Sequence, residues 1–102
     1  MKEIRATLQP YKLDDVLLAL AAIPSVPAAT VLDARTVAPD DPARELPKIR
    51  LELIVEDDRV EEIVRAIVTA AHTGHAGDGR VVVVPIERTV LIREGRKDGG
   101  IG

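Results

Sequence analysis

The segment Lys48–Val55 restricts the fold of this chain strongly, because apolar and charged side chains alternate along it. The apolar side chains fall on one side of an extended backbone: Ile49, Leu51, Leu53 and Val55. Three charged side chains fall on the other side: Lys48, Arg50 and Glu52. A period of two predicts a strand with one buried face. The chain must therefore build a sheet and cover one face of it with another layer.

Further segments have the patterns of strands. Lys2–Leu8 alternates in the same way, and Thr30–Val37 reads as a second strand. Val81–Ile86 is a continuous apolar run, which is typical of a buried strand. Thr89–Ile92 predicts a short final strand.

Two segments repeat apolar residues at helical spacing. The first contains Leu13, Val16, Leu17, Leu20 and Ile23. The second contains Val60, Ile63, Val64, Ile67, Val68 and Ala71. Asp14 and Asp15 suit the first turn of the first helix, where the helix dipole favours negative charge, and Pro24 ends it. Asp58 and Glu61 predict a capping box for the second helix.

The elements follow the order strand–helix–strand twice, joined by a turn-rich connector that begins at Ala38. This order predicts a single α+β domain over residues 1–102: a ferredoxin-like βαββαβ sandwich with two helices on one face of an antiparallel sheet. The other sheet face would be bare in a monomer. Hydrophobic residues make up 46% of the chain, but Tyr11 is its only aromatic residue. Short aliphatic side chains bury little area each, which favours further burial between subunits.

Charge and composition exclude several functions. The formal net charge is −3, which argues against general affinity for nucleic acid. The chain contains no cysteine, so thiol catalysis and thiolate metal sites are excluded. No apolar run approaches the length of a membrane span, and we expect a cytoplasmic protein. No Ser–His–Asp or Cys–His arrangement indicates hydrolysis, and we expect no enzyme activity.

The segment Thr73–Arg80 carries the strongest functional signal. Its three glycines permit positive φ angles and close approach of a ligand to the backbone. Successive N–H groups can form an anion-binding nest, and Arg80 adds a charge suited to phosphate. Because the loop follows a helix, the nearby helix end is the negative pole. Anion binding here would depend on the nest and on arginine. A plain glycine-rich turn between helix and strand is the alternative interpretation.

Four motifs together resemble the nitrogen regulatory PII family. The loop Thr73–Arg80 is similar to the family's B-loop, Thr-Gly-x-x-Gly-Asp-Gly followed by a basic residue. The segment from Pro10 to Val16 resembles Pro-aromatic-Lys-Leu-Asp-Asp-Val at the first helix, and the segment from Leu46 to Glu52 resembles the entry to the third strand. Ile92–Gly95 resembles the Ile-Arg-x-Gly of the C-terminal region.

The resemblance implies a compact homotrimer that binds adenine nucleotides in the clefts between subunits and regulates a protein target, such as a transporter or a metabolic enzyme. It places Thr30 and Glu52 near the adenosine. It places four loop residues around the phosphates: Gly77, Asp78, Gly79 and Arg80. Arg93 matches an arginine that a neighbouring subunit supplies, and Lys48 matches a lysine that helps hold an anion. No cofactor is required, and the ligand expected is ADP, AMP or ATP.

The sequence also departs from the family pattern. A short connector at residues 38–47 stands in place of the long T-loop, and Leu91 stands in place of a second phosphate arginine. These losses favour a nucleotide with fewer phosphates, and they leave open whether the regulated process belongs to nitrogen or carbon metabolism. The tail 94–102 is polar and glycine-rich, which predicts flexibility.

A second function stays open on the sequence. It is a trimer of the PII and CutA type that has lost nucleotide binding and acts as a scaffold, a small-anion binder or a metal binder. His72 and His75, three residues apart, suit a metal but equally suit an ordinary helix end. An acylphosphatase on the same fold is disfavoured, because the chain has no asparagine.

Overall fold

The computed structural model describes residues 1–93, and a four-stranded sheet with two helices accounts for most of them. The strands are β1 (Lys2–Leu8), β2 (Thr30–Ala38), β3 (Asp41–Val55) and β4 (Gly79–Pro85). The helices are α1 (Leu13–Ala21) and α2 (Val60–Ala71). A single 3-10 turn precedes each helix: η1 (Pro10–Lys12) and η2 (Asp57–Arg59). The predicted tail 94–102 lies outside the described residues.

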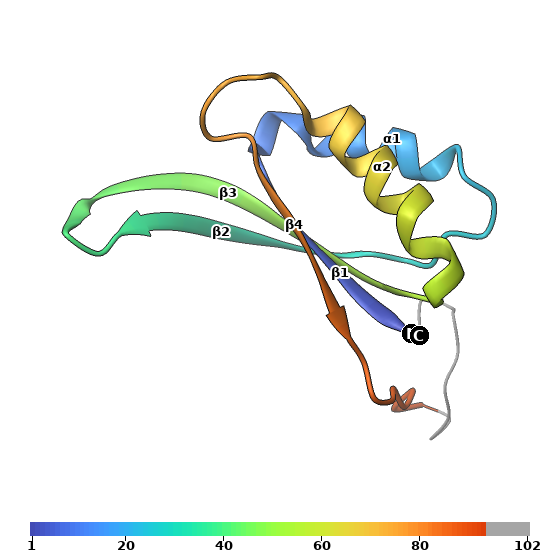
Figure 1. Ribbon diagram of the computed structural model, residues 1–102. Coiled ribbons are helices and arrows are strands. Elements are labelled where there is room, and N and C mark those ends of the chain that lie inside the picture. Colours follow the sequence, from blue (N-terminus) through green and yellow to red (C-terminus); the bar gives the residue numbers. More distant parts are fainter. Residues whose placement is uncertain (94–102) are drawn as a thin grey trace.

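The strands form one sheet in the order β2-β3-β1-β4, and every neighbouring pair is antiparallel (Figure 1). Both helices lie on the same side of this sheet. The predicted α+β sandwich with a ferredoxin-like element order is therefore confirmed. Because β2 and β4 are the edges, each has one side that pairs with no other strand within residues 1–93.

The core lies between the sheet and the two helices. Ile4, Ala6 and Leu8 of β1 are almost completely buried, as the alternation predicts. On β3 the same holds for Leu51, Leu53 and Val55, while Ile49 is half-buried. The helices contribute Val16, Leu20, Val60, Ile63, Ile67 and Ala71. Most of the predicted apolar stripe of each helix lies in or against this core, but Leu17 and Val68 are exposed and Ile23 follows the end of α1. α1 carries Asp14 and Asp15 in its first turn, as predicted.

The connector predicted at residues 38–47 is wrong as a loop, because most of it is strand. β2 and β3 pair as far as Ala38 and Asp41, so the hairpin reverses through only two residues. The hairpin extends beyond the rest of the sheet as a curved arm (Figure 1). Arg35 and Glu45 form an ion pair of 3.0 Å across it. The prolines indicate a turn in the sequence, but a two-stranded hairpin tolerates them because no third strand requires their missing N–H groups.

The expectation that Val81–Ile86 is a buried strand is also wrong for a single chain. The strand forms, but it lies at the edge of the sheet, and Val82 and Val83 are 43% and 40% exposed. The final strand expected at Thr89–Ile92 is reduced to an isolated bridge at Leu91.

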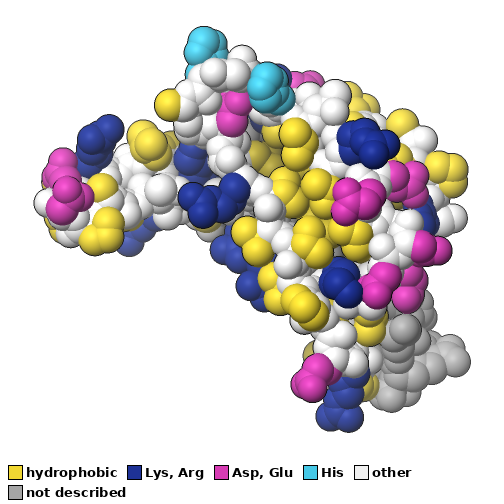
Figure 2. All heavy atoms as spheres, viewed as in Figure 1, with side chains coloured by type: hydrophobic (Ala, Val, Ile, Leu, Met, Phe, Trp, Pro, Cys, Tyr) yellow, Lys and Arg dark blue, Asp and Glu magenta, His cyan; other side chains and the backbone are white. Residues whose placement is uncertain are grey.

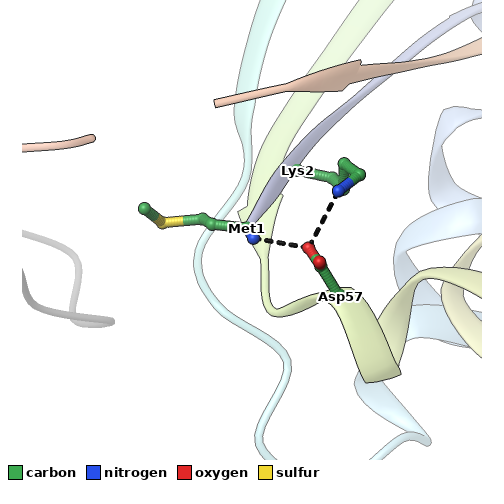
Figure 3. A network of polar contacts seen from close by, with 3 residues as sticks. All are labelled: Met1, Lys2 and Asp57. Carbon is green, nitrogen blue, oxygen red and sulfur yellow. Dashed lines mark hydrogen bonds and ion pairs between the residues drawn. The ribbon is translucent and has the colours of Figure 1, made fainter. Parts of the chain in front are cut away.

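The capping box expected from Asp58 and Glu61 is absent, since no side chain caps either η2 or α2. The neighbouring Asp57 instead accepts hydrogen bonds from the terminal ammonium of Met1 and from Lys2 Nζ, the latter at 3.1 Å (Figure 3). These hydrogen bonds, the one from Met1 above all, lower the pKa of Asp57. This contact ties the start of β1 to the segment that leads into α2.

Candidate functional site

The glycine loop that follows α2 is held together by one carboxylate. Asp78 accepts hydrogen bonds from the backbone N–H groups of Thr73, at 2.8 Å, and Gly74, at 2.9 Å. It also accepts a hydrogen bond from the Thr73 hydroxyl. The Thr73 Oγ1 in turn accepts a bond from the His75 N–H at 3.1 Å. Asp78 therefore acts as an internal anchor that fixes the loop before any ligand arrives.

These hydrogen bonds, first the one from the Thr73 hydroxyl and then those from the backbone, lower the pKa of Asp78 to about 2. Because the folded-state pKa lies below the ordinary value of 3.8, the anchor stabilises the loop at every pH above about 4. Its contribution is lost as the pH falls from about 4 through about 2.

We expect the amide chemical shifts of Thr73 and Gly74 to show an acid transition with a midpoint near the pKa of about 2. NMR titration of the loop amides measures this directly. Asp78→Asn is the control, because the amide side chain cannot titrate and both shifts should lose this transition. A midpoint at the ordinary pKa of 3.8 would show that the carboxylate does not anchor the loop.

The local structure explains why two positions of the loop are glycine. Gly77 and Gly79 both adopt positive φ angles, +95° and +101°. A Cβ added at Gly79 would lie 1.8 Å from the Thr7 carbonyl oxygen, because the first residue of β4 packs closely against the backbone of β1. Part of the glycine pattern is therefore set by strand packing and requires no ligand.

Lys48 is buried, although the alternation along Lys48–Val55 places it on the charged side of the strand. Only 5% of its surface is exposed, and its ammonium donates to the Gly77 carbonyl. Gln9 Nε2 lies on the same side of the loop, 3.0 Å from where a Gly77 Cβ would stand. Sequence reasoning missed this contact because it joins residues 29 positions apart.

Strand register brings three of the predicted binding residues, Thr30, Glu52 and Arg80, onto one face. Leu8 and its alternate neighbours on β1 point to the helices, so Arg5 and Thr7 point to the opposite face. One cross-strand row on that face contains Leu32, Arg50, Thr7 and Arg80. The next contains Thr30, Glu52, Arg5 and Val82. Lys and Arg side chains gather where the arm meets the body of the sheet (Figure 2).

The charges on this face differ in how they are paired. Arg5 pairs with Glu3, and Arg50 Nε lies 3.3 Å from a Glu52 carboxylate oxygen without hydrogen-bond geometry. Arg80 is exposed, and its side chain makes no hydrogen bond or ion pair within residues 1–93. Its guanidinium is therefore open to a ligand. Arg5 was not predicted as part of this face, because only the register reveals its place between Glu52 and Val82.

The predicted residues are divided between two hollows of the chain. A groove of about 1110 Å³ is lined by Thr30, Glu52 and Leu91 together with the segment that precedes β2. A smaller hollow of about 150 Å³ lies between α2 and β4 and includes Asp78, Gly79 and Arg80. Arg93 follows Leu91 by two residues, in a turn. One chain therefore does not gather all the predicted residues around a single hollow.

The described residues give no support to a metal site. His72 and His75 lie at the end of α2 and in the loop, but residues 1–93 contain no group of three His, Asp or Glu side chains placed to hold an ion. No helix in this part of the chain has the length and apolar content that a membrane crossing needs.

The fold and the loop define a small α+β protein with a preformed, cation-flanked loop at one end of its sheet. A family model for "Nitrogen regulatory protein P-II" matches residues 1–96. The chain is 38% identical to the nitrogen regulatory protein P-II of Azospirillum brasilense, over 97% of both chains. It is 35% identical to the nitrogen regulatory protein P-II 1 of Escherichia coli K12, over 96% of both.

A crystal structure of Arabidopsis thaliana PII bound to citrate superposes with a TM-score of 0.82 at 28% sequence identity, covering 93% of this chain and 82% of that one. The chain therefore belongs to the nitrogen regulatory P-II family. It is a regulatory protein by family, as the motifs predicted.

Proposed function

We propose that this protein is a homotrimeric, non-enzymatic regulator that binds an adenine nucleotide in the clefts between its subunits. Thr30 and Glu52 contact the adenosine. The phosphates are held by the loop Gly77–Arg80 and by Arg93 of a neighbouring subunit. The nucleotide is ADP or AMP in preference to ATP, because Leu91 offers no charge to a third phosphate. The protein regulates a partner in nitrogen or carbon metabolism, in the cytoplasm.

The division of the site between two hollows supports a cleft formed by two subunits. Thr30 and Glu52 line the larger groove, whereas Arg80 lies beside the other hollow. A neighbouring subunit that presents its glycine loop toward this groove would bring the predicted nucleotide-binding residues together. Exposed Val82 and Val83 on the edge strand support an apolar contact between subunits. Native mass spectrometry of the purified protein tests the trimer.

The observation that carries the proposal is the unpaired guanidinium of Arg80 next to a loop that is already ordered. Asp78 fixes the loop through three hydrogen bonds, so little conformational entropy is lost when an anion binds. Arginine presents donors in a planar fork that matches phosphate oxygens. Within residues 1–93, no carboxylate forms an ion pair with the Arg80 guanidinium, so its donors are available to a phosphate.

We expect Arg80→Ala to weaken ADP binding by about tenfold or more, since a charge-assisted hydrogen bond contributes roughly 1.5–3 kcal/mol. Isothermal titration calorimetry with ADP, AMP and ATP on the wild-type and variant proteins measures this. Arg44→Ala is the control, because Arg44 is also exposed, its side chain makes no hydrogen bond or ion pair within the described chain, and it lies on the arm. Unchanged ADP affinity in Arg80→Ala would contradict the placement of the phosphates.

The second candidate is a trimer that no longer binds nucleotides and takes a small anion instead, or acts as a scaffold or metal binder. The citrate in the Arabidopsis thaliana PII crystal structure favours the anion version, because Lys48 and Arg80 offer cations near the loop. Thermal denaturation with nucleotides, citrate and divalent cations separates the candidates. Stabilisation by citrate with none by any adenine nucleotide would favour the second one.

A further inference from the structure

We infer that Arg59 positions one wall of the larger groove, and that its guanidinium thereby sets the affinity of the groove for the nucleoside part of a ligand. Arg59 belongs to the turn η2, whereas the wall is the segment of residues 24–29 between α1 and β2. Arg59 is a positioning residue, because it acts on a ligand through this wall segment. The statement about a nucleoside rests on the proposed function, whereas the contact between Arg59 and the wall segment is a property of the free protein.

The wall segment has few bonds of its own. Residues 25–29 line the groove and lead directly into Thr30, the first residue of β2. Two residues of the segment are prolines, which have no N–H group to donate. Within residues 1–93, no backbone–backbone hydrogen bond involves residues 24–29. Val26 and Ala29 pack against the core, and the remaining contact that fixes the segment comes from the start of α2.

The guanidinium of Arg59 makes this contact and donates from all of its nitrogens. One terminal nitrogen donates to the Pro24 carbonyl at 2.7 Å, and the other donates to the Ser25 carbonyl at 3.4 Å. Nε donates to a carboxylate oxygen of Glu62 at 2.6 Å, in the first turn of α2. The pairing with Glu62 orients the planar fork, so that its outer edge faces two successive carbonyl groups. Figure 1 shows the segment between α1 and β2 passing beside the start of α2.

The backbone at Ser25 requires this support. Its φ angle is +59°, and Ser25 is the only non-glycine residue within residues 1–93 with a positive φ. This conformation is unfavourable for a residue with a Cβ, and it persists only where the surroundings fix it. The Pro24 carbonyl belongs to the peptide plane before the Ser25 Cα, and the Ser25 carbonyl belongs to the plane after it. By binding both carbonyls, Arg59 fixes the two planes whose relative rotation defines the backbone angles of Ser25.

The consequence for a ligand follows from the place of Ser25 at the beginning of the wall. Without the guanidinium, Ser25 would relax to an ordinary φ angle, and the residues after it would no longer present one fixed surface to the groove. A ligand would then have to order the wall segment as it binds, so its apparent Kd would rise as the ordered fraction falls. The hollow beside Arg80 shares no residue with this groove, so the contacts to phosphate should not change.

The first measurement is NMR relaxation of the backbone amides, without ligand, in wild type, Arg59→Met and Arg65→Met. Methionine keeps an unbranched stem, so the packing of the side-chain stem is retained. Arg65→Met is the matched control, because Arg65 is exposed on α2 and its side chain makes no hydrogen bond or ion pair within the described chain. We expect the order parameters of the wall segment to fall from about 0.85 to below about 0.6 in Arg59→Met only, with those of β1 unchanged.

Arg59→Lys provides a second test that keeps the positive charge. An ammonium lacks the planar fork that holds two successive carbonyls, so the order parameters of the wall segment should fall in this variant as well. Arg59→Lys also serves if Arg59→Met does not fold. Order parameters that stay at the wild-type level in the Arg59 variants would overturn the inference, and so would a fall of the same size in Arg65→Met.

The second measurement titrates the same proteins with ADP and with inorganic pyrophosphate, followed by the amide chemical shifts. The Kd for ADP should rise by about tenfold in Arg59→Met and stay the same in Arg65→Met, whereas the Kd for pyrophosphate should stay the same in both. An unchanged Kd for ADP in Arg59→Met, or a Kd for pyrophosphate that rises as much, would contradict a positioning role. If wild type binds no ADP, the proposed function fails, whereas the ligand-free relaxation still decides whether Arg59 holds the wall segment.

Discussion

Replacing Gly79 with alanine should lower the free energy of unfolding by at least about 3 kcal/mol, which makes it one of the most damaging single changes in the chain. The new Cβ would lie 1.8 Å from the Thr7 carbonyl oxygen and 2.8 Å from its carbonyl carbon. Both atoms belong to the backbone of β1, so no side-chain rotation relieves the clash. The φ angle of +101° adds the strain of a conformation that alanine rarely adopts.

Thermal denaturation followed by circular dichroism measures this effect. A loss of 3 kcal/mol corresponds to a fall of about 12–24 °C in the melting temperature for a domain of this size. Gly74→Ala is the matched control, because Gly74 also has a positive φ of +87° but its Cβ would meet only a His72 ring carbon at 3.8 Å. This variant should lose only about 1–2 kcal/mol. Equal losses in both variants would show that φ strain, and not contact with β1, decides the cost.

The sequence predicts well those elements whose period matches a buried face within one chain. β1 and β3 alternate, and their even and odd positions respectively lie against the helices. The stripe that includes Ile63 and Ile67 lies in the core for the same reason. Local pattern is sufficient here because each element buries one face against a neighbour in the same subunit.

Burial is predicted wrongly from the sequence where it depends on a contact outside the local segment. The valine run of β4 indicates a strand buried on both faces, but its place at the sheet edge leaves Val82 and Val83 partly exposed. An apolar edge strand of this kind is an attractive surface for another subunit. Lys48 is the reverse case, because a charged residue at an alternating position looks solvated until the loop folds over it.

The candidate site was predicted as a set of residues, and the structure divides that set by physical role. Asp78 and Gly79 serve the loop and the sheet, since the first bonds to Thr73 and Gly74 and the second avoids a clash with Thr7. Arg80 has no such internal role within residues 1–93. Mutational tests of ligand binding are therefore most informative at Arg80, where a change in affinity is not confounded by loss of the loop.

Leu51→Ala should also be severe, with an expected loss of about 2–5 kcal/mol in the free energy of unfolding. Leu51 is fully buried and lies in the middle of β3, paired with Ala6 on one side and Val31 on the other. Because Ala6 is small and the neighbouring strands are fixed by their hydrogen bonds, the surrounding residues have little freedom to fill the cavity. The expected cost therefore lies in the upper half of this range.

Chemical denaturation of wild type, Leu51→Ala and Leu18→Ala checks this, and all three are measured at one protein concentration because subunit association makes apparent stability depend on concentration. Leu18 is 71% exposed on α1, so the same chemical change there should alter the free energy of unfolding by no more than about 0.5 kcal/mol. A loss at Leu51 as small as the one at Leu18 would mean that β3 is not the centre of the core. The helix layer would then have to hold the fold together without it, which the burial of Leu51 against both neighbouring strands argues against.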